Sequence, residues 1–206
     1  MKDVVKKIVD SFSVSQDLTR FGVLLYSTDA KLQFNLVRYD SADSVKNAID
    51  NLPHMKSGTR IDKALREAKK SIFSLEGYVR QRRPTVLVVV TDGSTNRGSE
   101  DLRNASKPLK DFGVTVIAVG VGPEVNRYEL LKFASDPPTE NIITARSFRE
   151  LIPSIYSLTE KICRGKNMHC VRCLFMLIWR RSFYVNLHLM IKLQRDSGKR
   201  QDGLAH

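Results

Sequence analysis

Apolar residues follow two different periods in the first part of the chain. From Val4 to Phe12 they recur every three or four positions, which predicts that the chain opens inside an amphipathic helix. Residues 21–26 are almost all apolar, which predicts a buried strand. In residues 31–38 apolar and polar side chains alternate, which predicts a second, half-exposed strand after a hairpin-like turn.

Helical and strand patterns then alternate as far as residue 162. Helices are predicted at residues 44–51, 59–75, 102–109, 128–134 and 148–162, and strands at residues 84–91, 114–119 and 141–144. Residues 84–91 and 114–119 are apolar on both faces, as in the central strands of a parallel sheet. The pattern therefore predicts an α/β fold, with an open, mostly parallel sheet covered by helices on both faces.

Asp92 directly follows the most apolar of these strands. Ligand sites in open α/β sheets form at the carboxyl ends of the strands, so a carboxylate at this position indicates a site. The alternative is that Asp92-Gly93 is only a turn former, since Asp-Gly pairs favour tight turns.

Length and charge indicate one domain followed by an extra segment. The chain has 206 residues, 42% of them hydrophobic, which is enough to form a core. Its formal net charge is +12, and residues 164–206 hold nine Lys or Arg but only two Asp or Glu. Such a basic segment is usually a solvated or unfolded end, but it can also attract nucleic acid, acidic glycans or anionic membranes unspecifically. No apolar run is long enough to span a membrane, and the charged start does not resemble a signal peptide.

Five segments together resemble the von Willebrand factor type A domain family in order and spacing. They are residues 19–27 (TRFGVLLYS), 57–65 (SGTRIDKAL), 88–93 (VVVTDG), 113–122 (GVTVIAVGVG) and 131–137 (LKFASDP). The resemblance extends over residues 1–163 and is nearest to matrix proteins such as collagens and matrilins. It implies a Rossmann-like, three-layer fold and a binding module rather than an enzyme.

Members of this family carry a metal-ion-dependent adhesion site. It combines an Asp-x-Ser-x-Ser loop after the first strand with a Thr from a second loop and an Asp from a third. The resemblance assigns Thr59 and Asp92 to the second and third loops, whereas the first strand and its serine loop would precede Met1. Mg²⁺, or Mn²⁺ or Ca²⁺ in its place, prefers oxygen ligands. We therefore expect Thr59 and Asp92 to form part of a metal site that is incomplete in this chain.

Thr59, Asp92 and the glycines after residue 119 also allow other interpretations. Thr59 stands where an N-cap belongs, with Asp62 three residues later as in a capping box. Asp92 could itself begin an Asp-x-Ser-x-Ser loop, but Asn96 occupies the fifth position. A phosphatase-like Asp-x-Asp loop would need a carboxylate at Ser94, and a dinucleotide loop at 120–122 would need a glycine at Val125. We therefore expect no enzyme activity.

The cysteines lie at or beyond the end of the resemblance. Cys163, Cys170 and Cys173 are odd in number and give no closed disulfide framework. One Cys-x-x-Cys beside His169 is no more than the start of a zinc site. The resemblance implies that Cys163 has a disulfide partner just before the first strand in relatives.

Residues 164–206 allow two accounts. One account is a disordered segment or read-through from non-coding sequence. The other is a strand, since apolar residues alternate at Phe183, Val185, Leu187, Leu189, Ile191 and Leu193. The first strand of the family is central in its sheet, so its loss would leave two strands with unpaired backbone groups. The hypothesis is that the tail, or a neighbouring chain, inserts a strand there. Without such a strand we expect an unstable, aggregation-prone protein.

The sequence thus predicts a type A domain at residues 1–163 and a basic tail at residues 164–206. The resemblance implies an extracellular adhesion module that binds collagen or another matrix protein, with a divalent cation as the bridge. No specific nucleic-acid partner and no transmembrane segment are expected. The competing hypothesis is a non-functional or regulatory fragment whose basic tail binds acidic polymers.

Overall fold

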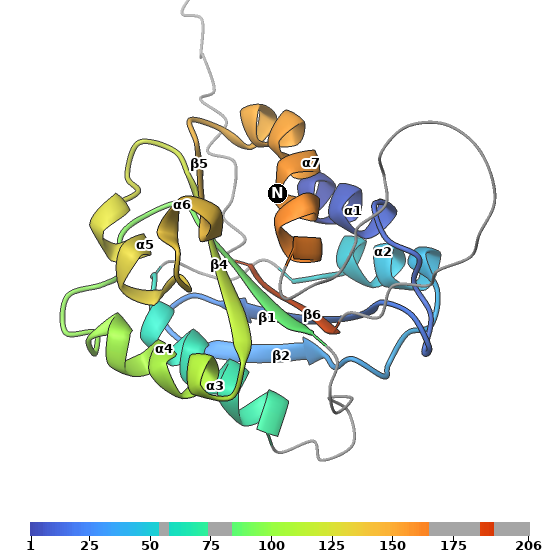
Figure 1. Cartoon of the computed structure of the whole chain (residues 1–206), viewed down its shortest axis with the longest axis horizontal. Helices are drawn as coiled ribbons and strands as arrows, with labels where there is room; N and C mark the ends of the chain where they lie inside the picture. Colours follow the sequence, from blue (N-terminus) through green and yellow to red (C-terminus); the bar gives the residue numbers. More distant parts are fainter. Residues whose placement is uncertain (54–57, 74–83, 165–185, 192–206) are drawn as a thin grey trace, which may run out of the picture.

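The computed structural model describes residues 1–53, 58–73, 84–164 and 186–191 (Figure 1). Its helices are α1 (Lys2–Asp10), α2 (Ala42–Asp50), α3 (Ile61–Phe73), α4 (Leu102–Asp111), α5 (Arg127–Phe133), α6 (Pro138–Asn141) and α7 (Phe148–Arg164). Its strands are β1 (Arg20–Tyr26), β2 (Ala30–Phe34), β3 (Thr85–Thr91), β4 (Val114–Val121), β5 (Ile142–Ala145) and β6 (Asn186–Ile191). Strands and helices alternate, as the sequence pattern predicts.

The six strands form one sheet in the order β2-β1-β6-β3-β4-β5. Only β2, at one edge, runs antiparallel to its neighbour, and the other pairs are parallel. Parallel strands need long crossovers, and the intervening helices provide them. The predicted mostly parallel α/β sheet is therefore confirmed.

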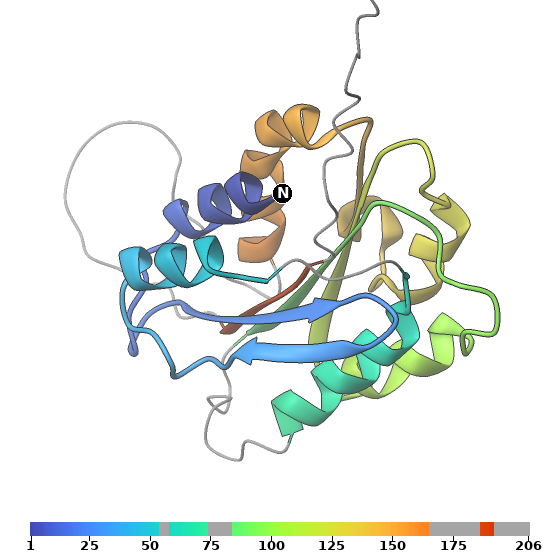
Figure 2. The ribbon, with the colours of Figure 1, turned by 180° about the vertical axis from the view of Figure 1, so that it is seen from behind.

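Helices cover both faces of the sheet (Figures 1 and 2). One core joins α1, α2 and α7 to the sheet, with Val86, Val88 and Val90 of β3 on this side. The other core joins α3, α4 and α5 to the opposite face, where Leu87 and Val89 lie. All seven residues of β3 are buried, which explains why this strand has no polar face in the sequence.

β6 comes from the tail and lies in the middle of the sheet. It pairs in parallel with β1, from Arg20 opposite Asn186 to Leu25 opposite Ile191. It also pairs with β3, from Thr85 to Val90, along the same six residues of β6. The hypothesis that the tail supplies the missing central strand is confirmed over Asn186–Ile191, and the backbone groups of β1 and β3 that face each other are thereby paired.

Local polar contacts explain the element ends that the hydrophobic pattern does not predict. β2 ends at Phe34 rather than at residue 38, because the Asn35 side chain accepts from the backbone N–H of Val37 (3.2 Å) and turns the chain. α2 begins earlier than predicted because Ser41 caps it, accepting from Ser44 N–H at 3.3 Å. The short α6 has no counterpart in the predicted elements. Among the described residues, no helix is long and apolar enough to cross a membrane.

The central position of β6 predicts that the tail contributes to stability. In Leu189→Pro the backbone loses one N–H donor within β6, and one acceptor on a neighbouring buried strand is left unpaired. We expect the free energy of unfolding to fall by roughly 1–3 kcal/mol or more, measured by urea titration. Lys199→Pro, in the same tail but outside β6, is the matched control. Equal stability of the two variants would contradict the seating of β6 in the sheet.

Candidate functional site

The carboxyl ends of the parallel strands meet at one edge of the sheet, and both predicted ligands lie in loops at this edge. Ile191, the last residue of β6, is in register with Leu25 of β1 and Val90 of β3. Asp92 directly follows β3, and Thr59 lies two residues before α3. Both therefore lie at the edge where ligand sites form in open α/β sheets.

The backbone around Thr59 is held closely against the end of β1. The N–H of Arg60 donates to the carbonyl of Ser27 at 2.8 Å. Gly58 adopts φ = +116°, and a Cβ there would lie 2.5 Å from Cγ2 of Thr28. Only glycine fits such a close approach at a positive φ. The result is a buried Thr59, which is 5% exposed.

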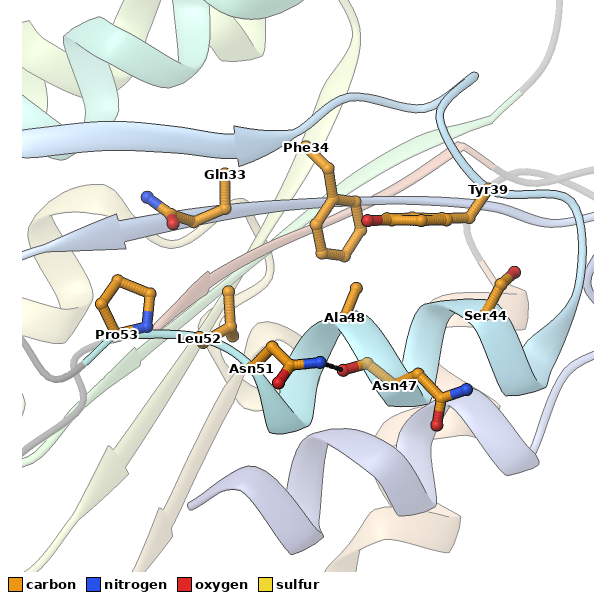
Figure 3. A pocket seen from close by; sticks show the side chains of 9 residues that line it. All are labelled: Gln33, Phe34, Tyr39, Ser44, Asn47, Ala48, Asn51, Leu52 and Pro53. Atoms are coloured by element: carbon orange, nitrogen blue, oxygen red, sulfur yellow. Dashed lines mark hydrogen bonds between the residues drawn. The ribbon is translucent and has the colours of Figure 1, made fainter.

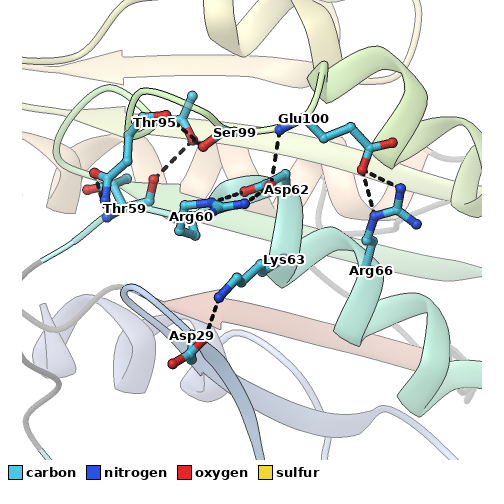
Figure 4. Close-up of polar contacts among 10 residues, drawn as sticks. Asp29, Thr59, Arg60, Asp62, Lys63, Arg66, Thr95, Ser99 and Glu100 are labelled. Atoms are coloured by element: carbon cyan, nitrogen blue, oxygen red, sulfur yellow. Dashed lines mark hydrogen bonds and ion pairs between the residues drawn. The ribbon is translucent and has the colours of Figure 1, made fainter.

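Three hydrogen bonds join the Thr59 loop to the loop that begins at Asp92 (Figure 4). The Thr59 N–H donates to Oδ1 of Asn96 at 3.1 Å, and the Asn96 N–H donates back to the Thr59 carbonyl at 2.8 Å. The same carbonyl accepts from the Thr95 hydroxyl at 3.0 Å. The two loops that the resemblance assigns to one site are thus physically connected.

The loop after Asp92 is also fixed on its other side. The Thr95 N–H donates to the Glu129 carboxylate of α5 at 2.8 Å, and the Ser94 hydroxyl donates to the Glu124 carbonyl at 3.2 Å. The Thr91 hydroxyl donates to the carbonyl of Gly93 at 2.9 Å. Asp92 and Gly93 therefore lie in a bend of the chain, and this bend carries the Asp92 carboxylate at the sheet edge.

A buried tyrosine contacts the end of β3, close to Asp92. The Tyr26 hydroxyl donates to the carbonyl of Val90 at 2.8 Å. Burial raises the pKa of Tyr26 far above its usual range, a hydrogen bond with Thr91 opposes that shift, and the negative charge of Asp92 adds to it. Tyr26 thus remains a neutral donor that fixes the end of β3, and the Asp92 charge is close enough to influence it.

Asp62 does not act as the predicted capping-box partner of Thr59. α3 begins at Ile61, and the buried Asp62 carboxylate accepts two hydrogen bonds from the Arg60 guanidinium, at 2.9 and 2.6 Å. It also accepts from the Glu100 N–H at 3.1 Å (Figure 4). Burial alone would raise the pKa of Asp62, but these donors and the Lys63 N–H outweigh it and lower the pKa to about 2. Asp62 therefore ties α3 to the segment that leads into α4.

The oxygen atoms at this edge suit a hard cation but make a small ligand set. Thr59 offers a hydroxyl and Asp92 a carboxylate, the ligand types that Mg²⁺ prefers. The carboxylate of Asp92 takes part in other polar interactions, and its Oδ1 atom is buried without a hydrogen-bond donor from the described residues. In the described part of the chain, no three His, Cys, Asp or Glu residues come together as a metal cluster.

Ser94 and Gly120, which the enzyme alternatives involve, each make a local contact. Ser94 stands where a phosphatase-like loop would need a second carboxylate, and its hydroxyl contacts Glu124. A Cβ at Gly120 would lie 2.5 Å from Cγ1 of Val125, so this glycine has a packing role. Cys163 belongs to α7, whereas His169, Cys170 and Cys173 lie outside the described residues.

A pocket lies apart from this edge, between β2 and α2 (Figure 3). Phe34 and Tyr39 form one wall, with their ring centroids 4.9 Å apart in an edge-to-face arrangement. Its lining residues are all uncharged: Gln33, Phe34, Tyr39, Ser44, Asn47, Ala48, Asn51, Leu52 and Pro53. It contains neither Thr59 nor Asp92, so it is separate from the candidate site.

Comparison with known families decides the identity of the fold. The family model described as the von Willebrand factor type A domain matches residues 1–158. The chain belongs to this family. The match ends before β6, so the strand that completes the sheet lies outside the family pattern.

Similar proteins of known identity are larger matrix proteins. This type A domain is 32% identical to matrilin-1 of Gallus gallus over 163 residues, which are 79% of this chain and 32% of that protein. It is 34% identical to the collagen alpha-4(VI) chain of Mus musculus over 135 residues, 66% of this chain and 6% of that protein. The chain thus spans about a third of matrilin-1 and far less of the collagen chain.

Solved structures show the same architecture. Proximal thread matrix protein 1 from the mussel byssus, described with a zinc-occupied MIDAS motif, superposes with a TM-score of 0.66 at 31% identity. That similarity covers 77% of this chain and 39% of the byssus protein. BatB from Bacteroides thetaiotaomicron, at 19% identity and a TM-score of 0.59, shares the fold, with 80% of this chain and 85% of that chain covered. The predicted Rossmann-like type A fold is confirmed.

The contact at Gly58 predicts a specific loss of stability. Gly58→Ala forces a side chain into a positive φ and against Thr28, so we expect unfolding to become easier by roughly 2–4 kcal/mol. Gly98→Ala is the matched control, because Gly98 also has a positive φ (+77°) but a Cβ added there would meet no atom within 4 Å. Its cost should be about 1 kcal/mol, from the backbone alone. Thermal or urea unfolding of both variants measures the difference.

The Asp62 interactions predict a pH-dependent contribution to stability. The pKa of Asp62 is lower in the folded protein than its ordinary value of 3.8, so its stabilisation is present above about pH 4 and is lost as pH falls through about 2. Asp62→Asn should lower the free energy of unfolding by roughly 1–3 kcal/mol at pH 7. The difference from wild type should shrink between pH 4 and 2 in urea titrations. A difference that stays constant over that range would contradict a charged Asp62.

Proposed function

We propose that this chain is a protein-binding module of the extracellular-matrix type, and that Thr59 and Asp92 are ligands of a divalent cation at its binding edge. The observation that supports this most directly is the set of three hydrogen bonds between the Thr59 loop and the loop after Asp92. They hold a hydroxyl and a carboxylate from two segments at the carboxyl edge of one sheet.

The relatives support the matrix setting. Matrilins and collagen VI are matrix proteins by name, and the byssus protein is described as a thread matrix protein. By analogy, we propose that the chain acts outside the cell, that its partner is collagen or another matrix protein, and that it is a binding module without catalytic activity. The domain would extend over residues 1–163, with β6 supplied by the basic segment at residues 164–206.

The chemistry of a partly open cation supports binding rather than catalysis. A cation held by one hydroxyl and one carboxylate keeps coordination positions for water or for a carboxylate of the partner. No Asp-x-Ser-x-Ser sequence occurs in the 206 residues. Two protein ligands hold a cation less tightly than a full family site, so the metal-dependent part of binding should be modest.

Substitution of the two ligands tests the proposal. Asp92→Asn and Thr59→Ala should each weaken Mg²⁺-dependent binding to immobilised collagen by about tenfold or more, because each removes a large part of a small ligand set. Asp40→Asn, which removes an exposed carboxylate from another loop, is the matched control and should leave binding unchanged. Surface plasmon resonance with Mg²⁺ and with EDTA separates the metal-dependent part.

A different outcome would favour the competing hypothesis. Binding that persists in EDTA, survives Asp92→Asn and disappears at high salt would point to unspecific attraction by the basic tail. Nine Lys or Arg residues in residues 164–206 could supply such attraction. Heparin in place of collagen would then bind at least as well, which a metal-bridged site does not predict.

A further inference from the structure

The space between β1 and β3 accepts a strand that the rest of the sheet does not contain. β6 fills this space with six residues, each in register with a residue of β1 and a residue of β3. The family pattern ends at residue 158, so β6 is joined to an otherwise recognisable domain only through the chain that follows α7. We call the space between β1 and β3 the strand-acceptor site.

The chain between α7 and β6 is long compared with the domain. α7 ends at Arg164 and β6 begins at Asn186. A connection of about twenty peptide units can span at most about 70 Å when extended. A domain of this size has a radius of gyration of about 15 Å. The covalent connection therefore permits β6 to reach the strand-acceptor site of its own domain or that of an adjacent molecule.

We propose that the strand-acceptor site also binds β6 of a second copy of this chain, which gives a dimer by reciprocal strand exchange. The backbone ladders to β1 and β3 are the same whether β6 belongs to the same chain or to its partner, so exchange loses no pairing. Each domain without β6 has two buried strands with unpaired backbone groups, which makes the site incomplete until a copy of β6 enters.

Concentration decides which copy of β6 enters. The covalent connection gives the chain's own strand an effective concentration in the millimolar range, so folding at micromolar concentration yields the monomer. Folding at a protein concentration that approaches the millimolar range yields the exchanged dimer. Once formed, the dimer dissociates slowly, because both ladders of a central strand must break before β6 can leave.

Two single-cysteine variants distinguish exchange from intramolecular pairing. Thr85 and Asn186 are in register between β3 and β6, and neighbouring strands lie about 4.8 Å apart, within the Cα separation that a disulfide spans. In a background with Cys163, Cys170 and Cys173 replaced by Ser, we would prepare Thr85→Cys in one chain and Asn186→Cys in another. A disulfide between these two chains can form at the register position only when β6 of one enters the domain of the other.

The expected result is a covalent heterodimer when the two variants are refolded together at several hundred micromolar, and about a hundredfold less at a few micromolar. Adding Leu189→Pro to the Asn186→Cys chain should abolish it, because the proline removes a ladder donor without changing the cysteine. The double variant Thr85→Cys/Asn186→Cys, refolded at low concentration, should give a crosslinked monomer.

Two outcomes would overturn the proposal. Intramolecular crosslinking of the double variant at every concentration, with no heterodimer in the mixture, would show that the site accepts only its own β6. A heterodimer that Leu189→Pro leaves unchanged would show contact without strand insertion.

The unmodified chain, refolded in reductant at high concentration, provides a second measurement. Light scattering should find a dimer that persists after dilution, and a monomer at all refolding concentrations would contradict exchange.

Discussion

The pairing of β6 between β1 and β3 is the interaction on which the remaining structure depends. A strand in the middle of a sheet satisfies backbone groups on both of its neighbours, and these groups have no access to water because helices cover both faces. Without β6 the sheet would divide into a β1–β2 hairpin and a β3–β4–β5 unit. The two hydrophobic cores each draw residues from both parts, so neither core would remain intact.

The candidate site depends on the same pairing. Thr59 is held against the end of β1 through Ser27, and Asp92 follows β3, so the two proposed ligands are attached to strands on opposite sides of β6. The bonds between Thr59 and Asn96 bridge the two sides at the loops, while β6 bridges them in the sheet. The distance between the hydroxyl and the carboxylate is therefore set by two independent connections.

Sequence patterns predicted most elements because the side chains that each element buries leave a recognisable pattern. β3 and β4 lie between two layers of helices and are buried on both faces, so their sequences are continuous apolar runs. The pattern failed at the end of β2. Leu36 continues the apolar alternation and is buried, but the Asn35 side chain accepts from the Val37 N–H and the chain turns before Leu36 can extend the strand. Thr59 and Asp92 could be predicted as ligands because the family pattern contains a Thr and an Asp at these places. The role of Asn96 depends on loops that meet only in the folded chain, and no local spacing reveals it.

Asp62 has the spacing of a capping residue, yet a bidentate contact with the Arg60 guanidinium satisfies its buried carboxylate better than one backbone donor would.

The strand that completes the sheet and the two proposed cation ligands lie on different segments of the chain. In the family, the central strand and the serine loop of the metal site are one continuous segment, so a molecule that completes its sheet also places its first metal ligands. In this chain β6 occupies the central position but is reached from the other end of the domain, and no Asp-x-Ser-x-Ser sequence is present. Completion of the sheet and the proposed cation site therefore depend on different segments of the chain. A change in β6 acts first on stability, whereas a change at Thr59 or Asp92 acts first on the proposed cation site.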